Sequence, residues 1–211
     1  SKFIKSNNSS IELQNSHFME GTFYCNDYIF DLLQNKVLIC QGFICSTNDN
    51  FKCTLSRGGS DTTASLIASK IIADRLEIWT DVDGIYNSNP SIVSGAKIIK
   101  NIDYELSQEL SAMGAKVIHP YCINPCKEKN IPIYIKNTYG SNVENTVINN
   151  EYSNEYALMI DRNINVFEIT SVDMWNDYGF VSHIFQSFNE NGIDINIITT
   201  SQFSVMATTN E

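Results

Sequence analysis

The chain has 211 residues, of which 43% are apolar and 18% charged, a composition typical of a globular protein with one large or two modest domains. No apolar run approaches the ~20 residues of a membrane span, and the first ten residues lack the apolar stretch of a secretory signal. The net charge of −10 argues against broad nucleic-acid binding, which needs basic surface, although a local nucleotide site stays open.

The polar N-terminal segment, residues 1–22, predicts a loop or excursion. Beyond it, strands alternate with helices, which favours a largely parallel α/β sheet covered on both faces. Gly, Ser and Asn between residues 139 and 155 indicate a linker or a loosely held edge. The expected helices are 29–33, the segment after Ser60, 104–113 ended by Gly114, and 120–129; the expected strands are 37–44, 76–79 and 131–135.

The C-terminal segment predicts a separate β-α-β-β unit. A strand candidate at 166–170 precedes an amphipathic helix over 180–191, which Gly179 opens. Two further strands are expected at 193–199 and 203–208. Composition alone leaves open a generic ferredoxin-like half-domain without a ligand.

The six cysteines contain no Cys-x-x-Cys pair, so they give a poor zinc signal. Cys122 and Cys126, four apart, can share one helical face, but two thiols do not complete a tetrahedral site. The three histidines lie far apart in the sequence. We therefore expect a reduced, cytoplasmic protein with thiols in its core and no metal site.

The segment Thr54-Leu-Ser-Arg-Gly-Gly-Ser-Asp-Thr-Thr-Ala64 places a cation, two glycines and a carboxylate where a loop enters a helix. Glycines let backbone N–H groups approach a ligand, and a helix N-terminus favours an anion. Arg57 adds a planar fork suited to a carboxylate or phosphate, and Ser60 or Asp61 can cap the helix. Alone, this segment reads as a glycine-bearing turn before an ordinary helix.

Two later blocks change that interpretation: Leu76-Glu-Ile-Trp-Thr-Asp-Val-Asp-Gly-Ile-Tyr86 and Gly114-Ala-Lys-Val-Ile-His-Pro120. In this order and spacing the three blocks resemble the catalytic half of an aspartokinase, most closely the lysine-sensitive monofunctional type. Gln41-Gly-Phe-Ile44 is also similar to that family. The resemblance covers roughly residues 37–211. It implies part of a three-layer, parallel-sheet amino-acid-kinase lobe over 1–150 and an incomplete ACT regulatory domain over 156–211.

Aspartokinases transfer the γ-phosphoryl group of ATP, with Mg²⁺, to the side-chain carboxylate of L-aspartate, the first step toward lysine, threonine and methionine. The attacking oxygen is already anionic, so such a site needs cations and backbone donors more than a strong base. By resemblance, Arg57 grips the substrate carboxylate and Asp61 orients its amino group or a neighbouring lysine. The implied aspartate-binding residues are Phe43, Arg57, Gly58, Gly59, Ser60 and Asp61.

The resemblance also implies a nucleotide-binding site, formed by residues just past the end of a strand, where open α/β sheets bind ligands. Thr80, Asp81 and Tyr86 would meet the base and ribose, and Lys116 the phosphates. Without the resemblance, the Thr-Asp turn is a tight connection, Lys116 a solvated charge and Phe43 a core aromatic. His119-Pro120 is expected to begin the next helix rather than to take part in chemistry.

The chain departs from the family pattern in several places. Ser56 replaces the usual glycine, and Asn89-Pro90-Ser91 replaces Asp-Pro-Arg, so one nucleotide-facing arginine is missing. Ser1-Lys-Phe3 lacks the glycines of the family's Lys-Phe-Gly-Gly-Thr motif. These departures predict a fragment that lacks the N-terminal part, ends before a second ACT repeat and is inactive alone.

The sensor-like segment predicts an amino-acid effector, lysine or threonine, and a homodimer through ACT domains. Asn196 and Gln202 stand where lysine-sensitive relatives place acids, and Asp177 can restore one charge. The candidate regulatory residues are Met174, Asp177, Val181, Ile195, Asn196, Ser201 and Gln202. Two alternatives stay open: a non-catalytic regulatory subunit of an aspartokinase, and a relative such as a glutamate or uridylate kinase.

Overall fold

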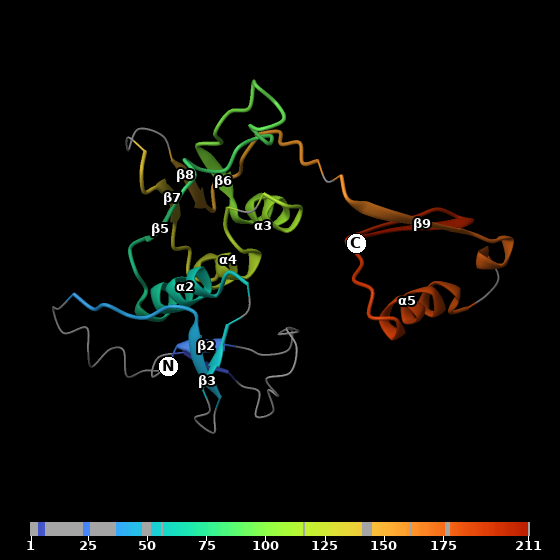
Figure 1. Ribbon diagram of the computed structural model, residues 1–211, viewed down its shortest axis with the longest axis horizontal. Helices are drawn as coiled ribbons and strands as arrows, with labels where there is room; N and C mark the ends of the chain where they lie inside the picture. The colour runs from blue at the N-terminus through green and yellow to red at the C-terminus, as the bar shows by residue number, and fades with distance from the viewer. Residues whose placement is uncertain are drawn as a thin grey trace. The chain divides into compact units, whose positions relative to one another are not determined.

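The computed structural model describes residues 4–6, 23–25, 37–47, 52–55, 57–115, 117–140, 145–160, 162–175 and 178–210. The predicted helix at 29–33 lies outside these residues. The chain is α/β and divides into two compact units, Ser1–Met159 and Ile160–Glu211, coloured blue to yellow and orange to red in Figure 1. Within the described residues, no helix is long and apolar enough to cross a membrane.

The main sheet of the first unit has the strand order β5-β7-β8-β6. These strands span Leu76–Thr80 (β5), Ile133–Asn137 (β7), Thr146–Asn149 (β8) and Asn101–Asp103 (β6). β5 pairs parallel with β7 and β6 parallel with β8, but β7 and β8 are antiparallel. The expectation of a largely parallel sheet is therefore wrong at its centre, because the short connection between β7 and β8 permits only a reversal.

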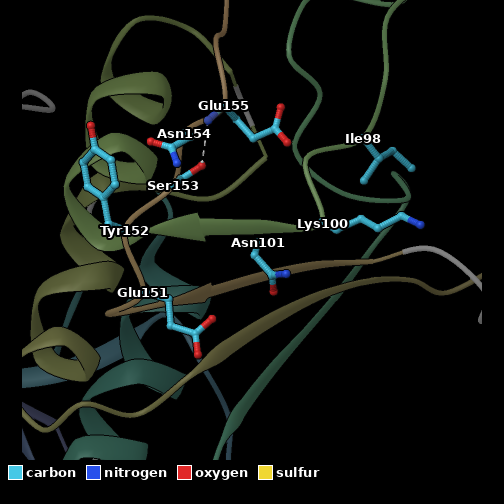
Figure 2. A pocket seen from close by; sticks show the side chains of 8 residues that line it. All are labelled: Ile98, Lys100, Asn101, Glu151, Tyr152, Ser153, Asn154 and Glu155. Atoms are coloured by element: carbon cyan, nitrogen blue, oxygen red, sulfur yellow. Dashed lines mark hydrogen bonds between the residues drawn. The ribbon is translucent and has the colours of Figure 1, made fainter.

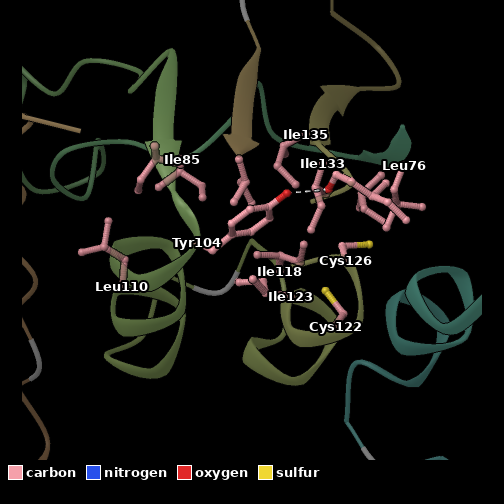
Figure 3. Close-up of a cluster of buried hydrophobic side chains, with 14 of the residues drawn as sticks. Leu76, Ile85, Tyr104, Leu110, Ile118, Cys122, Ile123, Cys126, Ile133 and Ile135 are labelled. Atoms are coloured by element: carbon pink, nitrogen blue, oxygen red, sulfur yellow. Dashed lines mark hydrogen bonds between the residues drawn. The ribbon is translucent and has the colours of Figure 1, made fainter. Parts of the chain in front are cut away.

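Three helices accompany this sheet: α2 (Gly59–Ile71), α3 (Tyr104–Ala112) and α4 (Pro120–Lys127). All three were predicted from the sequence, and α3 ends one residue earlier than expected. Strand side chains that alternate in sequence alternate between the two faces of the sheet. One set packs with the helices in the core shown in Figure 3: Leu76 and Ile78 from β5, Ile133 and Ile135 from β7, Tyr104 and Leu110 from α3, and Ile123 from α4.

The opposite face of the sheet carries a polar and aromatic cluster. Lys136 Nζ lies 2.8 Å from Glu77 Oε1 and 5.2 Å from the centroid of the Trp79 ring. Trp79 is half exposed. Among the described residues, the helices thus cover one face of the sheet rather than the two that were predicted.

A smaller sheet of the first unit has the order β2-β1-β3-β4. Its strands are Ile4–Ser6 (β1), Phe23–Cys25 (β2), Ile44–Thr47 (β3) and Lys52–Thr54 (β4). The strand predicted over 37–44 is wrong, because regular structure begins only at Ile44 and Val37 is 95% exposed. Phe43, at φ 70°, turns the chain out of the extended conformation just before β3.

The segment predicted as a linker, 139–155, contains β8, a central strand of the main sheet. The apolar pattern of the sequence does not reveal this strand, because the first buried residue of the strand is polar. Thr146 is fully buried, and its hydroxyl accepts from Ile85 N and donates to Ile99 O. Both bonds satisfy a group that would otherwise be costly to bury.

The expectation of core thiols is confirmed. Cys45, Cys53, Cys122 and Cys126 are buried as free cysteines. Cys122 and Cys126 share the buried face of α4, as their spacing predicted, and Cys126 Sγ lies 3.7 Å from Ser65 Oγ of α2.

The second unit has the predicted β-α-β-β order. It consists of β9 (Ile164–Thr170), the 3-10 turn η1 (Val172–Trp175), α5 (Phe180–Glu190), β10 (Ile197–Thr200) and β11 (Ser204–Asn210). The sheet is antiparallel in the order β10-β11-β9. α5 packs on one face, where Phe188 meets Phe167 edge to face at 5.3 Å between centroids.

Candidate functional site

The glycine-rich segment forms the beginning of α2. Gly58 is the N-cap, at φ 72°, and among the described residues no side-chain capping bond is present. The expectation that Ser60 or Asp61 caps it is wrong, because both already lie in the first turn. The first N–H groups of α2 therefore keep their capacity for an external acceptor, as an anion site requires.

Both glycines stand where a side chain would collide. A Cβ at Gly58 would approach the His119 ring, with Cγ at 2.6 Å. One at Gly59 would lie 2.6 Å from Leu55 Cβ and 2.7 Å from Phe43 Cδ2. The structure thus brings Phe43, Gly58 and Gly59 together, and it adds His119, which the sequence did not place there.

His119 also caps α4, with Pro120 in its first turn, so the expectation that His119-Pro120 begins a helix is confirmed. Its Nδ1 accepts from Tyr121 N at 3.4 Å. This bond calls for an unprotonated Nδ1. One histidine therefore joins the beginnings of α4 and α2.

Charges converge on this junction. Burial lowers the pKa of His119, Asp61 raises it, and the Arg57 cation lowers it. Burial raises the pKa of Asp61, and His119 lowers it. Arg57 is exposed and Asp61 half-buried, so a cation and a shielded carboxylate flank the glycine turn.

A second group of predicted residues follows β5. Thr80 Oγ1 donates to Asp81 Oδ1 at 3.1 Å, and Thr138 N donates to Thr80 O at 2.8 Å. Asp81 is exposed just past the strand's carboxyl end. The position is the one where α/β sheets bind ligands.

Asp83 organises this edge, a role that the sequence analysis missed. Its Oδ1 accepts from Asn137 Nδ2 at 2.8 Å, and its Oδ2 from the Tyr86 hydroxyl at 3.4 Å. Asn137 ends β7 and pairs in register with Thr80. The Asp83-Gly84 pair gave only a turn signal, and Asn137 gave none, because its partner is 54 residues away.

The described candidate regulatory residues of the second unit lie in three places. Ser201 closes the β10–β11 turn, where its Oγ lies 2.7 Å from Ser204 Oγ, and Gln202 is exposed in that turn. Ile195 and Asn196 precede β10 at its opposite end, roughly 16 Å from Ser201 over the five residue steps that separate Asn196 from Ser201. Met174 lies in η1 and Val181 in the first turn of α5, which pack together.

Three of the residues singled out from the sequence, Ser56, Lys116 and Asp177, lie outside the described part of the chain. A hollow of about 450 Å³ lies elsewhere in the first unit and contains none of the predicted site residues (Figure 2). Lys100, Glu151 and Glu155 line it but are exposed, so it does not hold them in a converging arrangement. The glycine turn and the end of β5 remain the better candidates.

The described residues contain no group of three or more His, Cys, Asp or Glu side chains placed to hold a metal ion. Mg²⁺ commonly keeps its waters and binds through substrate phosphates with one or two carboxylates. The described residues therefore provide no protein cage for a metal, and a Mg²⁺ ion would be held chiefly by the phosphates of a bound nucleotide.

Comparisons with known proteins agree with these features. Residues 15–137 match the model of the amino acid kinase family. Lysine-sensitive aspartokinase 3 of Escherichia coli is 37% identical over 179 residues, which make up 83% of this chain and 40% of that protein. The chain thus spans less than half the length of this relative.

Solved structures give the same result. E. coli aspartokinase III in complex with lysine and aspartate (T-state) superposes with a TM-score of 0.78 at 31% identity, covering 99% of this chain and 47% of that one. The same enzyme in complex with aspartate and ADP (R-state) gives 0.76 at 31% identity, covering 100% and 47%.

Proposed function

The chain belongs to the amino acid kinase family, and from this membership and the geometry of its first unit we propose that it is part of an ATP-dependent aspartate kinase. The observation that carries the proposal is the beginning of α2, where a helix N-terminus that no described side chain caps adjoins Arg57 and the half-buried Asp61. The relatives named as aspartokinases support this assignment.

Aspartate binds, in this proposal, at the glycine turn. Arg57 holds a carboxylate in two-point fashion, and the N–H groups of Gly59 and Ser60 supply further donors. Asp61 faces the substrate ammonium group. Burial raises the pKa of Asp61, and a cation bound beside it would lower that pKa again. Phe43, packed at Gly59, forms the apolar wall of the pocket.

The nucleotide binds at the end of β5. Thr80 and Asp81 contact the base and ribose, Tyr86 is held by Asp83, and Lys116 reaches the phosphates. In α/β folds a helix runs antiparallel to the strand that follows it, so the helix begins at the edge of the sheet where that strand ends. The start of α2 and the end of β5 are therefore suited to bind the two substrates of one reaction. Mg²⁺ neutralises phosphoryl charge when it binds with ATP.

The chain's own groups orient the reaction rather than remove a proton. The substrate carboxylate attacks as an anion, and the bond from the γ-phosphorus to the β–γ bridging oxygen breaks, which gives 4-phospho-L-aspartate and ADP. Cations and backbone donors stabilise the charge that spreads over the phosphoryl oxygens. Arg57 and the N-terminus of α2 meet this need.

The second unit is, in this proposal, an ACT domain over 156–211 that follows the catalytic part over 1–150. Lysine or threonine binds it and inhibits the kinase. Met174, Asp177, Val181, Ser201 and Gln202 form one part of the regulatory site. Ile195 and Asn196 lie at the other end of β10, so we place them beside a second copy of the chain in a homodimer. The four buried free thiols suit the cytoplasm.

ADP release tests the proposal on protein expressed from the complete gene. With Mg²⁺ and ATP, we expect turnover with L-aspartate and none with L-glutamate or UMP. Arg57→Ala, with its fold checked by circular dichroism, serves as the site control and should release ADP much more slowly at the same aspartate concentration. Folded protein that binds lysine or threonine yet releases no ADP would instead identify a regulatory subunit.

A further inference from the structure

A single buried hydroxyl connects the two sides of the proposed aspartate pocket. Thr63, in the second turn of α2, is 4% exposed. Its Oγ1 donates to Gly59 O at 2.8 Å and accepts from Phe43 N at 3.1 Å. A hydroxyl offers one donor and two acceptor positions, so both bonds are satisfied at once.

Phe43 needs such a restraint. It has φ 70°, a left-handed conformation that non-glycine residues keep only where their surroundings hold them. Its carbonyl accepts from Leu55 N at 2.8 Å, and its N–H goes to Thr63. The backbone of Phe43 is therefore fixed on both sides, by β4's end and by α2.

The ring of Phe43 occupies the space that Gly59 leaves by lacking a Cβ, with Cδ2 2.7 Å from where that Cβ would lie. Gly42 approaches Ser60 less closely, because a Cβ at Gly42 would lie 3.3 Å from Ser60 Cα. The turn at 42–43 and the first turn of α2 thus fit together over a small area. Thr63 is the side chain that bonds both of them.

We propose that Thr63 is a positioning residue for aspartate: its hydroxyl sets the place of Phe43 relative to the N–H groups of α2 without touching the substrate. The inference rests on the proposed aspartate kinase activity. Removing the hydroxyl releases the Phe43 N–H, which lets the turn relax and widens the pocket. Aspartate binding weakens, while the nucleotide edge beyond β5 is unaffected.

The neighbouring threonine provides a matched control. Thr62 Oγ1 donates to Gly58 O at 3.1 Å, but Thr62 N makes a bond to the same carbonyl at 3.0 Å. The Thr62 hydroxyl is thus redundant, and it does not reach Phe43. The same substitution at the two positions separates loss of a hydroxyl in α2 from loss of this connection.

The experiment compares Thr63→Val, Thr63→Ser and Thr62→Val in protein expressed from the complete gene. Thr63→Val should raise the KM for aspartate roughly tenfold, the effect of leaving one partly buried donor unpaired, and should leave the KM for ATP unchanged. Thr63→Ser, which keeps the hydroxyl, and Thr62→Val should both behave as wild type. Equal rises in both KM values, or the same defect in Thr62→Val, would overturn the proposal.

Hydrogen exchange at the Phe43 amide gives a readout that needs no activity. We expect slow exchange in wild type, Thr63→Ser and Thr62→Val, and fast exchange in Thr63→Val. If Thr63→Val does not fold, exchange in the wild type, Thr63→Ser and Thr62→Val still tests the proposal. Fast exchange of the Phe43 amide in the wild type would contradict the hydrogen bond from Phe43 N to Thr63. A wild-type protein with a protected amide but no aspartate-dependent turnover would refute the kinase assignment and leave the connection intact.

Discussion

Replacing Gly58 by alanine is the most demanding test of the glycine turn. Alanine at φ 72° costs about 1–2 kcal/mol because of its Cβ. That Cβ would also overlap the His119 side chain, whose Cγ lies 2.6 Å from it, and overpacking of this kind costs about 1–3 kcal/mol. The reduced freedom of the unfolded chain offsets only about 0.4–1 kcal/mol.

We therefore expect Gly58→Ala to destabilise the first unit by about 1–4.6 kcal/mol. Urea unfolding measures this loss as a fall in midpoint of roughly 0.5–2 M. Gly95→Ala is the matched control, since nothing lies within 4 Å of a Cβ there and its φ is not positive. It should change stability by no more than about 0.5 kcal/mol.

A double-mutant cycle divides the two contributions. In a His119→Gly background, which lacks the His119 Cβ as well as the ring, Gly58→Ala should lose the overlap and keep only the conformational cost of about 1–2 kcal/mol. Equal costs in both backgrounds would show that His119 does not pack on the turn. A Gly58→Ala protein within 0.5 kcal/mol of wild type would refute the whole argument.

Three further predictions concern Tyr104, Glu77 and Arg57. Tyr104→Phe leaves the Ile131 carbonyl, 2.8 Å from the Tyr104 hydroxyl, without this donor and should cost about 1–3 kcal/mol in urea unfolding. Burial also raises the pKa of Tyr104 to about 12, so the stabilisation by its protonated hydroxyl is complete below pH ~10 and is lost as pH rises toward 12. Across that range, the free energy of unfolding should fall less steeply with pH in Tyr104→Phe than in the wild type. Glu77→Gln should cost less than about 1 kcal/mol, because its ion pair with Lys136 is partly exposed, and the cost should shrink at 1 M salt. The hydrogen bond from Lys136 lowers the pKa of Glu77. The stabilisation by this pair is therefore present above the ordinary glutamate pKa and is lost as pH falls through the lowered pKa. Acid unfolding of the wild type and of Glu77→Gln measures this loss. Arg57→Ala should lower kcat/KM for aspartate roughly 10- to 100-fold, the size of a charge-assisted bond, and an unchanged value in steady-state kinetics would remove Arg57 from the pocket.

The helices were predictable because their signals are local. Spacing of apolar residues located α3 and α5, and Gly114 and Pro120 marked where one helix ends and another begins. The strand order was less accessible. Whether β8 runs parallel or antiparallel to β7 depends on the connection between them, and its buried Thr146 hides the strand from an apolar pattern.

The candidate site was predictable in part for the same reason. Arg57, Gly58 and Gly59 stand next to one another in sequence, so together with the two later blocks their pattern made this segment a candidate anion site. His119 meets Gly58, and Asn137 meets Asp83, across large sequence separations. A single sequence carries no sign of such contacts, because each partner is an ordinary residue in its own segment.

Trapping the acyl phosphate with hydroxylamine tests the central claim most directly. Protein from the complete gene, incubated with Mg²⁺, ATP and L-aspartate, should yield aspartate β-hydroxamate by mass spectrometry, and Arg57→Ala should yield far less. Folded wild-type protein that consumes no ATP and forms no hydroxamate would contradict the claim that the beginning of α2 binds aspartate for phosphorylation.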